Sequence, residues 1–276
     1  MKGLIMKKIS CTNYEYTSQK IGNAFDGFKI TVLSDLHAVD LGNNNEDLYN
    51  KIKEISPDII ITAGDMVSSN GKNFNTVISL FERLIEICPI YYGIGNHELK
   101  LSINDKTTKK FKYYKRQLRK MGVKILNNRS IRLRIGEKVL RISGVNIEKK
   151  FYSKFYNKSI MPSDYINSLL KPCNNNRIEL LIAHNPDYFD NYVSWGADIV
   201  LSGHIHGGLV VLPILGGVIA PSLRLFPYYD YGCFANKDSM LYLSRGLGAH
   251  TIPIRLFNPP EIMTVTLRNS YKNTID

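Results

Sequence analysis

Apolar residues in this chain fall into short continuous runs separated by longer amphipathic segments. Short runs rich in Ile, Val and Leu are typical of buried strands, and an apolar residue at every third or fourth position is typical of a helix. The runs that predict strands are 7–17, 28–34, 58–63, 89–94, 178–183, 197–201, 209–212, 241–244 and 261–267, with further short strands in 123–143 around a turn at Gly136-Glu137. The segments that predict helices are 46–56, 74–87, 107–121 and 187–195. Strands and helices in alternation predict an α/β fold.

Side chains that can bind metals directly follow five of the predicted strands. These residues are Asp35 and His37, Asp65, Asn96 and His97, His184, and His204 and His206. Residues two positions apart in an extended backbone point to the same side, so the two Asp/His and His/His pairs each face one place. Open α/β sheets place their sites outside the carboxyl ends of the strands, so we expect all of these side chains to converge on one edge.

The donor types in this set indicate the chemistry. Imidazole, carboxylate and amide oxygen together suit a borderline divalent metal such as manganese, iron, zinc or cobalt. Seven candidate ligands exceed what one tetrahedral ion with an open position needs. They fit two ions about 3.5–4 Å apart that share a bridging carboxylate. Any one of these histidines is more simply interpreted as an ordinary hydrogen-bonded residue, but five of the six histidines of the chain together favour the metal site.

Charge is distributed unevenly along the 276 residues. The net charge is +12, and residues 100–158 hold nineteen Lys and Arg against only three acids. A basic block of this kind indicates an anionic partner, which is a phosphate-rich substrate, a nucleic acid or a membrane surface. A solvated lysine-rich face is the simpler alternative. In the predicted helix 107–121 we expect Phe111, Tyr114, Leu118 and Met121 to face inward and the charges to face outward.

The four cysteines are scattered without CxxC spacing, which is typical of a reducing compartment rather than of a disulfide framework. No apolar run approaches the length that crosses a bilayer. We therefore expect a cytoplasmic protein, with contact at the inner membrane face through the basic segment as a further expectation. The simplest organisation is a single domain, 1–276, with a basic helical and β insertion at about 100–158.

Five motifs occur in a fixed order along the chain. They are Asp35-Leu36-His37, Gly64-Asp65, Gly95-Asn96-His97-Glu98, the lone His184 after a strand, and Gly203-His204-Ile205-His206. This order resembles that of the calcineurin-like metallophosphoesterase superfamily. The segments Ser244–Gly248, Pro253–Arg255 and Pro259–Ile262 also resemble those of bacterial members named as phosphodiesterases, including relatives of the UDP-diacylglucosamine pyrophosphatases. The resemblance implies a four-layer α-β-β-α sandwich in which two mixed sheets pack face to face, with a dimetal site at the carboxyl ends of the strands.

The resemblance also implies a role for each residue of the site. Asp35, His37, Asp65 and His206 would hold one metal, and Asp65, Asn96, His184 and His204 the other, with Asp65 as the bridge. His97 would be the histidine that is not a ligand and lies near the leaving group, where it is catalytic; a purely orienting role is the alternative. Arg245 and His250 are weaker candidates for substrate binding, because a structural ion pair and an incidental loop histidine explain them as simply.

The function implied is a phosphoester hydrolase, either a phosphodiesterase or a phosphatase. Two divalent ions per chain, with manganese favoured, would carry a bridging hydroxide that attacks a small or lipid-linked phosphoester. One alternative is a nuclease of the same superfamily that acts on DNA or RNA, with the basic segment along the nucleic acid backbone. The other alternative is a non-catalytic metal-binding scaffold.

Overall fold

The computed structural model describes residues 8–152, 159–208, 211–212, 216–217, 228–248, 255 and 257–270. Within these residues the chain forms two six-stranded mixed sheets, together with a short antiparallel pair of β10 (Val211–Leu212) and β11 (Gly216–Gly217). The α/β fold expected from the alternating pattern is confirmed. None of the described helices combines the length and the hydropathy that a membrane-crossing segment needs.

The first sheet provides three of the strands that lead to the predicted site. Its strands, in spatial order, are β1 (Ser10–Thr17), β14 (Glu261–Arg268), β2 (Lys29–Leu33), β3 (Ile59–Thr62), β4 (Ile90–Gly93) and β5 (Lys124–Leu126). Strands β2 to β5 run parallel to one another, and β14 is antiparallel to β2. The carboxyl ends of β2, β3 and β4 therefore lie on the same edge.

The second sheet provides the other two strands that lead to the predicted site. Its strands, in spatial order, are β12 (Gly232–Asn236), β13 (Ser239–Leu243), β9 (Ile199–Ser202), β8 (Ile178–Ala183), β7 (Lys138–Val145) and β6 (Arg129–Ile135). The four central strands are parallel, and both edge strands are antiparallel to their neighbours. The β6–β7 hairpin confirms the predicted turn at Gly136-Glu137.

Alternate residues of the central strands face opposite sides, and both sides are apolar. In β3, Ile59 and Ile61 pack between the two sheets, whereas Ile60 packs under the helices of the first sheet. In β8, Leu180 lies between the sheets and Leu181 under the helices of the second sheet. This is why the sequence shows continuous apolar runs rather than alternation.

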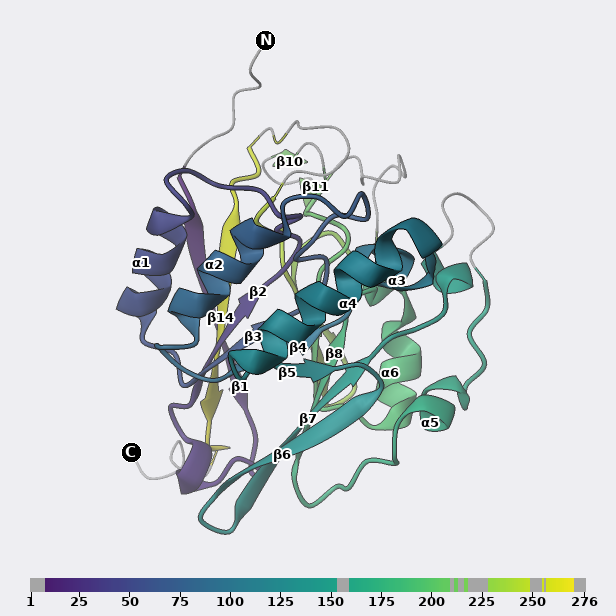
Figure 1. Ribbon diagram of the computed structural model, residues 1–276. Coiled ribbons are helices and arrows are strands. Elements are labelled where there is room, and N and C mark those ends of the chain that lie inside the picture. The colour runs from purple at the N-terminus through teal and green to yellow at the C-terminus, as the bar shows by residue number, and fades with distance from the viewer. Residues whose placement is uncertain are drawn as a thin grey trace.

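Helices cover the outer face of each sheet, so that the expected four layers are present. Figure 1 shows the long helix 105–120 crossing in front of the strands of the first sheet, and the two helices that cover the second sheet at the right of the view. The helices are α1 (Glu46–Ile55), α2 (Phe74–Leu84), α3 (Asn96–Ile103), α4 (Asp105–Lys120), α5 (Tyr165–Leu169) and α6 (Phe189–Trp195). Three short 3₁₀ segments are η1 (Asn23–Phe25), η2 (Lys149–Tyr152) and η3 (Pro186–Tyr188).

Helix α3 is not among the predicted elements. It begins at Asn96, immediately after β4, with Gly95 as its N-cap. The Glu98 side chain accepts a hydrogen bond from the Gly95 N–H at 3.1 Å, which is one half of a capping box; glycine has no side chain to provide the other half. The Gly95–Glu98 motif thus starts a helix in addition to providing a candidate metal ligand.

The basic segment 100–158 is distributed over several elements. It contributes β5 to the first sheet, and β6 and β7 to the second. In α4, Phe111, Tyr114 and Leu118 are buried and Met121 packs against them, so the predicted inner face is confirmed.

Candidate metal centre

The predicted ligands lie on loops that leave the carboxyl ends of β2, β3, β4, β8 and β9. Backbone hydrogen bonds join these loops, with Asp35 N–H donating to Gly64 O and His37 N–H donating to Asp65 O, both at 3.0 Å. The second sheet joins the first where His204 N–H donates to both carboxylate oxygens of Asp35, at 3.1 and 3.2 Å. The two sheets therefore bring all seven predicted ligands to one edge.

Several of these residues adopt a backbone conformation that L-residues rarely use. The positive φ values are 53° for Asp35, His37 and Asp65, 75° for His204 and 57° for His206. A non-glycine residue in this region costs on the order of 1 kcal/mol, and such residues persist where the surrounding structure holds them. Strain concentrated in five residues at one point is typical of a functional site.

The first group of candidate ligands is Asp35, His37 and His206, all of them buried. The Nε2 atoms of His37 and His206 face each other at 3.1 Å, and the two rings stack with an interplanar angle of 3°. His206 Nε2 lies 3.3 Å from Asp35 Oδ1. The Ser34 hydroxyl donates to the other oxygen, Asp35 Oδ2, and orients the carboxylate.

The second group is Asp65, His184 and His204, with Asn96 beside it. His184 Nε2 is 3.1 Å from Asp65 Oδ2 and 3.1 Å from Asn96 Oδ1. The other ring nitrogen, Nδ1, contacts Ala63 O at 2.6 Å, which fixes the direction in which Nε2 points. Asp65 also belongs to a further group with His37 and His97, so it stands between the two sets of donors.

The spacing of these donor atoms fits metal ions. Atoms that bind one ion at about 2.0–2.2 Å lie roughly 3 Å apart from one another. His206 Nε2 is 3.1–3.3 Å from its two neighbouring donors, and so is His184 Nε2, whereas His37 Nε2 and Asp35 Oδ1 are 4.0 Å apart. The donors within each group all approach to less than 4.8 Å of one another. The described residues can therefore hold metal ions in two adjacent places.

The protonation preferences in the cluster favour a cation. Burial raises the pKa of Asp35, but His206 and His184 outweigh it and hold that pKa below its usual range. Burial lowers the pKa values of His37 and His204 to about 3, with His206 and His184 respectively adding to the effect. Burial also disfavours charge on His184, yet Asp65 raises the pKa of its imidazole to about 10. Charged carboxylates thus face the neutral imidazoles of His37 and His204, which is the state in which both types of side chain bind metals. The His184 imidazole, in contrast, is protonated beside Asp65 and must release its proton to bind an ion.

His97 differs from the other histidines of the cluster in its hydrogen bonds. Its Nδ1 accepts the Ser69 N–H at 3.0 Å, and its Nε2 lies 3.9 Å from Asp65 Oδ2. With Nδ1 as an acceptor, the neutral ring carries its proton on Nε2, which is directed at the cluster. Burial lowers the pKa of His97, so the neutral form is favoured.

Two residues that position the candidate ligands, Glu98 and Asn258, were not predicted from the sequence. The Glu98 carboxylate is fully buried and accepts hydrogen bonds from the Asp65 N–H at 2.9 Å and from the Tyr92 hydroxyl at 2.7 Å. Burial, with a further contribution from Asp65, raises the pKa of Glu98 to about 8. Its place in the Gly95–Glu98 motif was a signal that could have identified it.

Asn258 is the second positioning residue, and nothing in the sequence around it indicates that it contacts the candidate metal centre. Its amide donates to His206 O at 2.6 Å and to Gly208 O at 2.7 Å, so it holds the loop that carries two of the histidines. Asn258 is in turn held by the Arg255 guanidinium, which also donates to the carbonyl oxygens of Arg245 and Gly248.

Of the two weaker candidates, Arg245 makes structural contacts. The Arg245 guanidinium stacks over the Tyr231 ring at 3.8 Å, and its Nε lies 3.8 Å from Glu261 Oε1. These contacts correspond to the structural ion pair that was the alternative interpretation. His250 lies outside the described residues.

Comparison with known proteins agrees with the strand-end motifs. The family model for calcineurin-like phosphoesterases matches residues 28–208, which include every predicted ligand. The Bacillus subtilis (strain 168) protein named Uncharacterized metallophosphoesterase YkuE is 29% identical over 275 residues, covering 95% of this chain and 86% of YkuE. An Aquifex aeolicus (strain VF5) protein, also named an uncharacterized metallophosphoesterase, is 27% identical over 247 residues, covering 87% of this chain and 85% of its own.

Solved structures show more distant likenesses. Phosphopantetheinyl Hydrolase (PptH) from Mycobacterium tuberculosis has a TM-score of 0.49 and 13% identity, over 79% of this chain and 88% of its own. A dimetal phosphatase from Danio rerio has a TM-score of 0.44 and 8% identity, over 80% of this chain and 88% of its own.

The fold and the cluster of strand-end donors define a metal-binding hydrolase of phosphoester bonds. The chain belongs to the calcineurin-like phosphoesterase family.

Proposed function

We propose that this chain is a two-metal phosphodiesterase or phosphatase. Asp35, His37, Asp65 and His206 hold one divalent ion, and Asp65, Asn96, His184 and His204 hold the other. The observation that carries the proposal is the pair of donor groups at one sheet edge, with Asp65 between them. The donor atoms within each group lie within 4.8 Å of one another, and the closest pairs are 3.1–3.3 Å apart.

Two bound divalent ions supply a nucleophile at neutral pH and neutralise the charge of the phosphoryl group. The protein supplies orientation. Glu98 accepts the Asp65 N–H, and Ala63 O contacts His184 Nδ1, so these two ligands are held before any ion binds. A donor set that needs no rearrangement binds the ions without an additional cost of ordering.

His97 donates a hydrogen bond from Nε2 to the oxygen on which charge develops as the phosphorus–oxygen bond breaks. Protonation of Nδ1 would place two N–H groups opposite each other, because the Ser69 N–H already points at this nitrogen. The ring therefore stays neutral, and it acts by hydrogen bonding rather than by proton transfer.

Manganese is the metal that we propose, since imidazole and carboxylate donors together suit a borderline ion better than magnesium, which prefers oxygen ligands and water. The test is hydrolysis of bis-p-nitrophenyl phosphate by protein that has been stripped of metal and then reloaded. We expect manganese to restore turnover more fully than magnesium. Elemental analysis should find two ions per chain. Full activity after exhaustive chelation would contradict the two-metal proposal, and bound metal without turnover of any phosphoester would support the scaffold alternative.

A further inference from the structure

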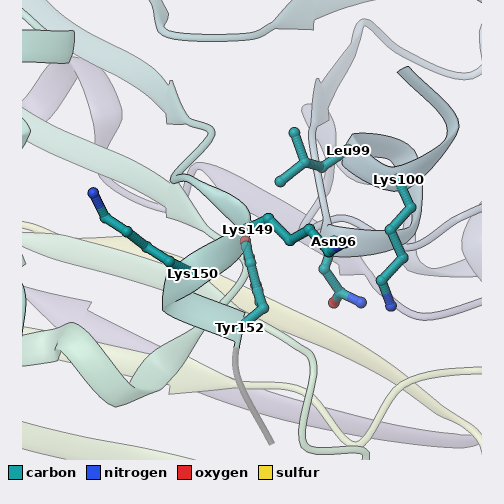
Figure 2. Close-up of a pocket in the computed structure, with 6 residues that line it drawn as sticks. All are labelled: Asn96, Leu99, Lys100, Lys149, Lys150 and Tyr152. Carbon is teal, nitrogen blue, oxygen red and sulfur yellow. The ribbon is translucent and has the colours of Figure 1, made fainter. Parts of the chain in front are cut away.

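A pocket of about 340 Å³ lies beside the candidate metal centre. Its lining residues are Asn96, Leu99, Lys100, Lys149, Lys150 and Tyr152 (Figure 2). Pockets that hold small ligands begin at roughly 300 Å³. The pocket is therefore large enough for part of a substrate.

Helical periodicity explains why these residues converge. In α3, Asn96 and Lys100 are four positions apart and so lie on the same face of the helix. In the 3₁₀ segment η2, Lys149 and Tyr152 are three positions apart, which is one full turn. Helix α3 packs against η2, and the two faces together form the pocket.

The pocket shares a wall with the candidate metal centre. Asn96, a proposed ligand, lines the pocket and contacts His184 Nε2 through its Oδ1 at 3.1 Å. The Tyr152 ring packs edge-on against the His204 ring, with the centroids 5.4 Å apart. A substrate held at the metals would therefore extend into this pocket.

The charges of the pocket are positive. Lys149 extends across it toward Asn96, whereas the Lys150 side chain points away (Figure 2). Lys150 pairs with Glu148 at 3.1 Å, and Glu148 is not among the residues that line the pocket. None of the six lining residues is an acid. Leu99, the Tyr152 ring and the lysine stems add apolar surface.

We propose that this pocket is a substrate subsite in which Lys100 and Lys149 bind a second phosphate of the phosphoester that is hydrolysed. The inference rests on the proposed function, because it takes the scissile group to lie at the metals. An ammonium group is a point charge that binds phosphate without a fixed orientation. The apolar surface between the two lysines accepts the body that connects the two phosphates.

The test uses two chromogenic diesters that differ only in the second phosphate. These are the p-nitrophenyl ester of thymidine 5′-phosphate and the same ester with an added 3′-phosphate. We expect the wild-type protein to have the higher kcat/KM on the 3′-phosphorylated ester. Lys149→Gln should reduce this preference roughly tenfold, mainly through KM, because a hydrogen bond to a charged group is lost. Lys100→Gln should do the same, and Lys149→Arg should retain the preference.

Lys150→Gln is the matched control, since it removes the same charge from the adjacent position, and it should leave the preference unchanged. Equal kcat/KM values for the two esters in the wild-type protein, with bis-p-nitrophenyl phosphate still hydrolysed, would overturn the subsite and leave the proposed function standing.

Calorimetric titration separates the two proposals if no ester is hydrolysed. Thymidine 3′,5′-bisphosphate should bind more tightly than thymidine 5′-monophosphate, and Lys149→Gln should abolish the difference. That result without turnover would support the subsite and contradict the proposed hydrolase. Equal binding of the two nucleotides would overturn the subsite.

Discussion

Strand β8 connects two buried clusters of charged residues. In one of them the carboxylate is paired with arginines, and in the other the carboxylates face imidazoles. Near the start of β8, Glu179 forms ion pairs with Arg141, which is buried, and with Arg177 at 2.8 Å. Just beyond its end, His184 faces Asp65 at the candidate metal centre. Both clusters are nearly inaccessible to solvent, and in both the carboxylates accept several hydrogen bonds.

The two clusters differ in where their positive charge comes from. At the start of β8, the chain supplies the cations, and the nearby Asp198 has Lys20 at 2.6 Å as its partner. At the other end, no lysine or arginine among the described residues forms an ion pair with Asp35 or Asp65, and the carboxylates face imidazoles. Buried charges are costly unless they are paired or coordinate a metal. The first cluster is complete as a structural unit, whereas the second is suited to a cation from outside.

The largest expected effect is that of Asp65→Asn. A neutral amide in place of the proposed bridge removes the charge that both ions share, so turnover of a phosphodiester should fall by several orders of magnitude. Elemental analysis should show loss of both metal equivalents. Asn45→Asp, a charge change at a buried residue that is not a proposed ligand, serves as the control and should retain both ions. Full metal content in Asp65→Asn would show that Asp65 is not the bridge.

The next effect is that of His97→Ala, which we expect to lower kcat by roughly 10²–10³-fold, because one hydrogen-bond donor to the developing charge is lost, while the metal content stays near that of the wild type. His97→Asn is the matched variant, since its side-chain oxygen can accept the Ser69 N–H but offers nothing in place of Nε2. It should be as slow as the alanine variant. A metal equivalent lost from both variants would make His97 a ligand.

Arg141→Met tests the complete cluster. The methionine keeps an unbranched apolar stem but leaves Glu179 without its buried partner, which should lower the free energy of unfolding by about 3–5 kcal/mol. Urea unfolding measures this change, and Arg177→Met, at a more exposed position, should cost less. Metal content should not change in either variant. Loss of metal from Arg141→Met without loss of stability would contradict the division into two independent clusters.

The reactivity of Cys173 measures how accessible the Arg141–Glu179 cluster is to solvent, because Cys173 Sγ accepts a hydrogen bond from Arg141 Nη2 at 3.3 Å. Burial, with a further contribution from Glu179, raises the pKa of the Cys173 thiol to about 12. The thiol is therefore protonated at pH 8, and its reaction with a thiol reagent should be slow and should rise about tenfold per pH unit. The exposed Cys11 and Cys233 should react first. Equal rates for all of these thiols in the native protein would show that the cluster is open to solvent.

The smallest effect concerns the outer face of α4. That this basic face binds an anionic partner remains a prediction. Changing the exposed Lys109, Lys110, Arg116 and Lys120 together to Gln should weaken binding to vesicles of anionic lipid. Each basic residue contributes about 1 kcal/mol near such a surface, and salt screens the effect. Turnover of a small phosphodiester should stay within a few-fold of the wild type.

Equal vesicle binding by the wild type and the fourfold variant at low salt would show that the outer face of α4 is only a solvated surface. Loss of DNA or RNA binding and cleavage, with vesicle binding unchanged, would favour the nuclease alternative.

The order of the elements and the residues at the strand ends could be predicted from the sequence alone. Continuous apolar runs, as in 58–63 and 178–183, indicate buried strands. The residue that follows such a run therefore lies at the carboxyl end of a strand. The inner face of α4 was equally predictable, because its periodicity is local. These predictions depend only on neighbours within a few positions along the chain.

The contacts that hold the strand ends, and the residues that lie next to them, depend on the tertiary structure. The positive φ angles of Asp35 and His204 oppose local preference and persist because loops from both sheets bond to each other. Asn258 reaches the His206 loop from about fifty positions away, and Lys149 meets Asn96 from a similar separation. Such contacts arise when two sheets and their connecting segments pack together, and no local pattern records a pairing between segments that become neighbours only on folding.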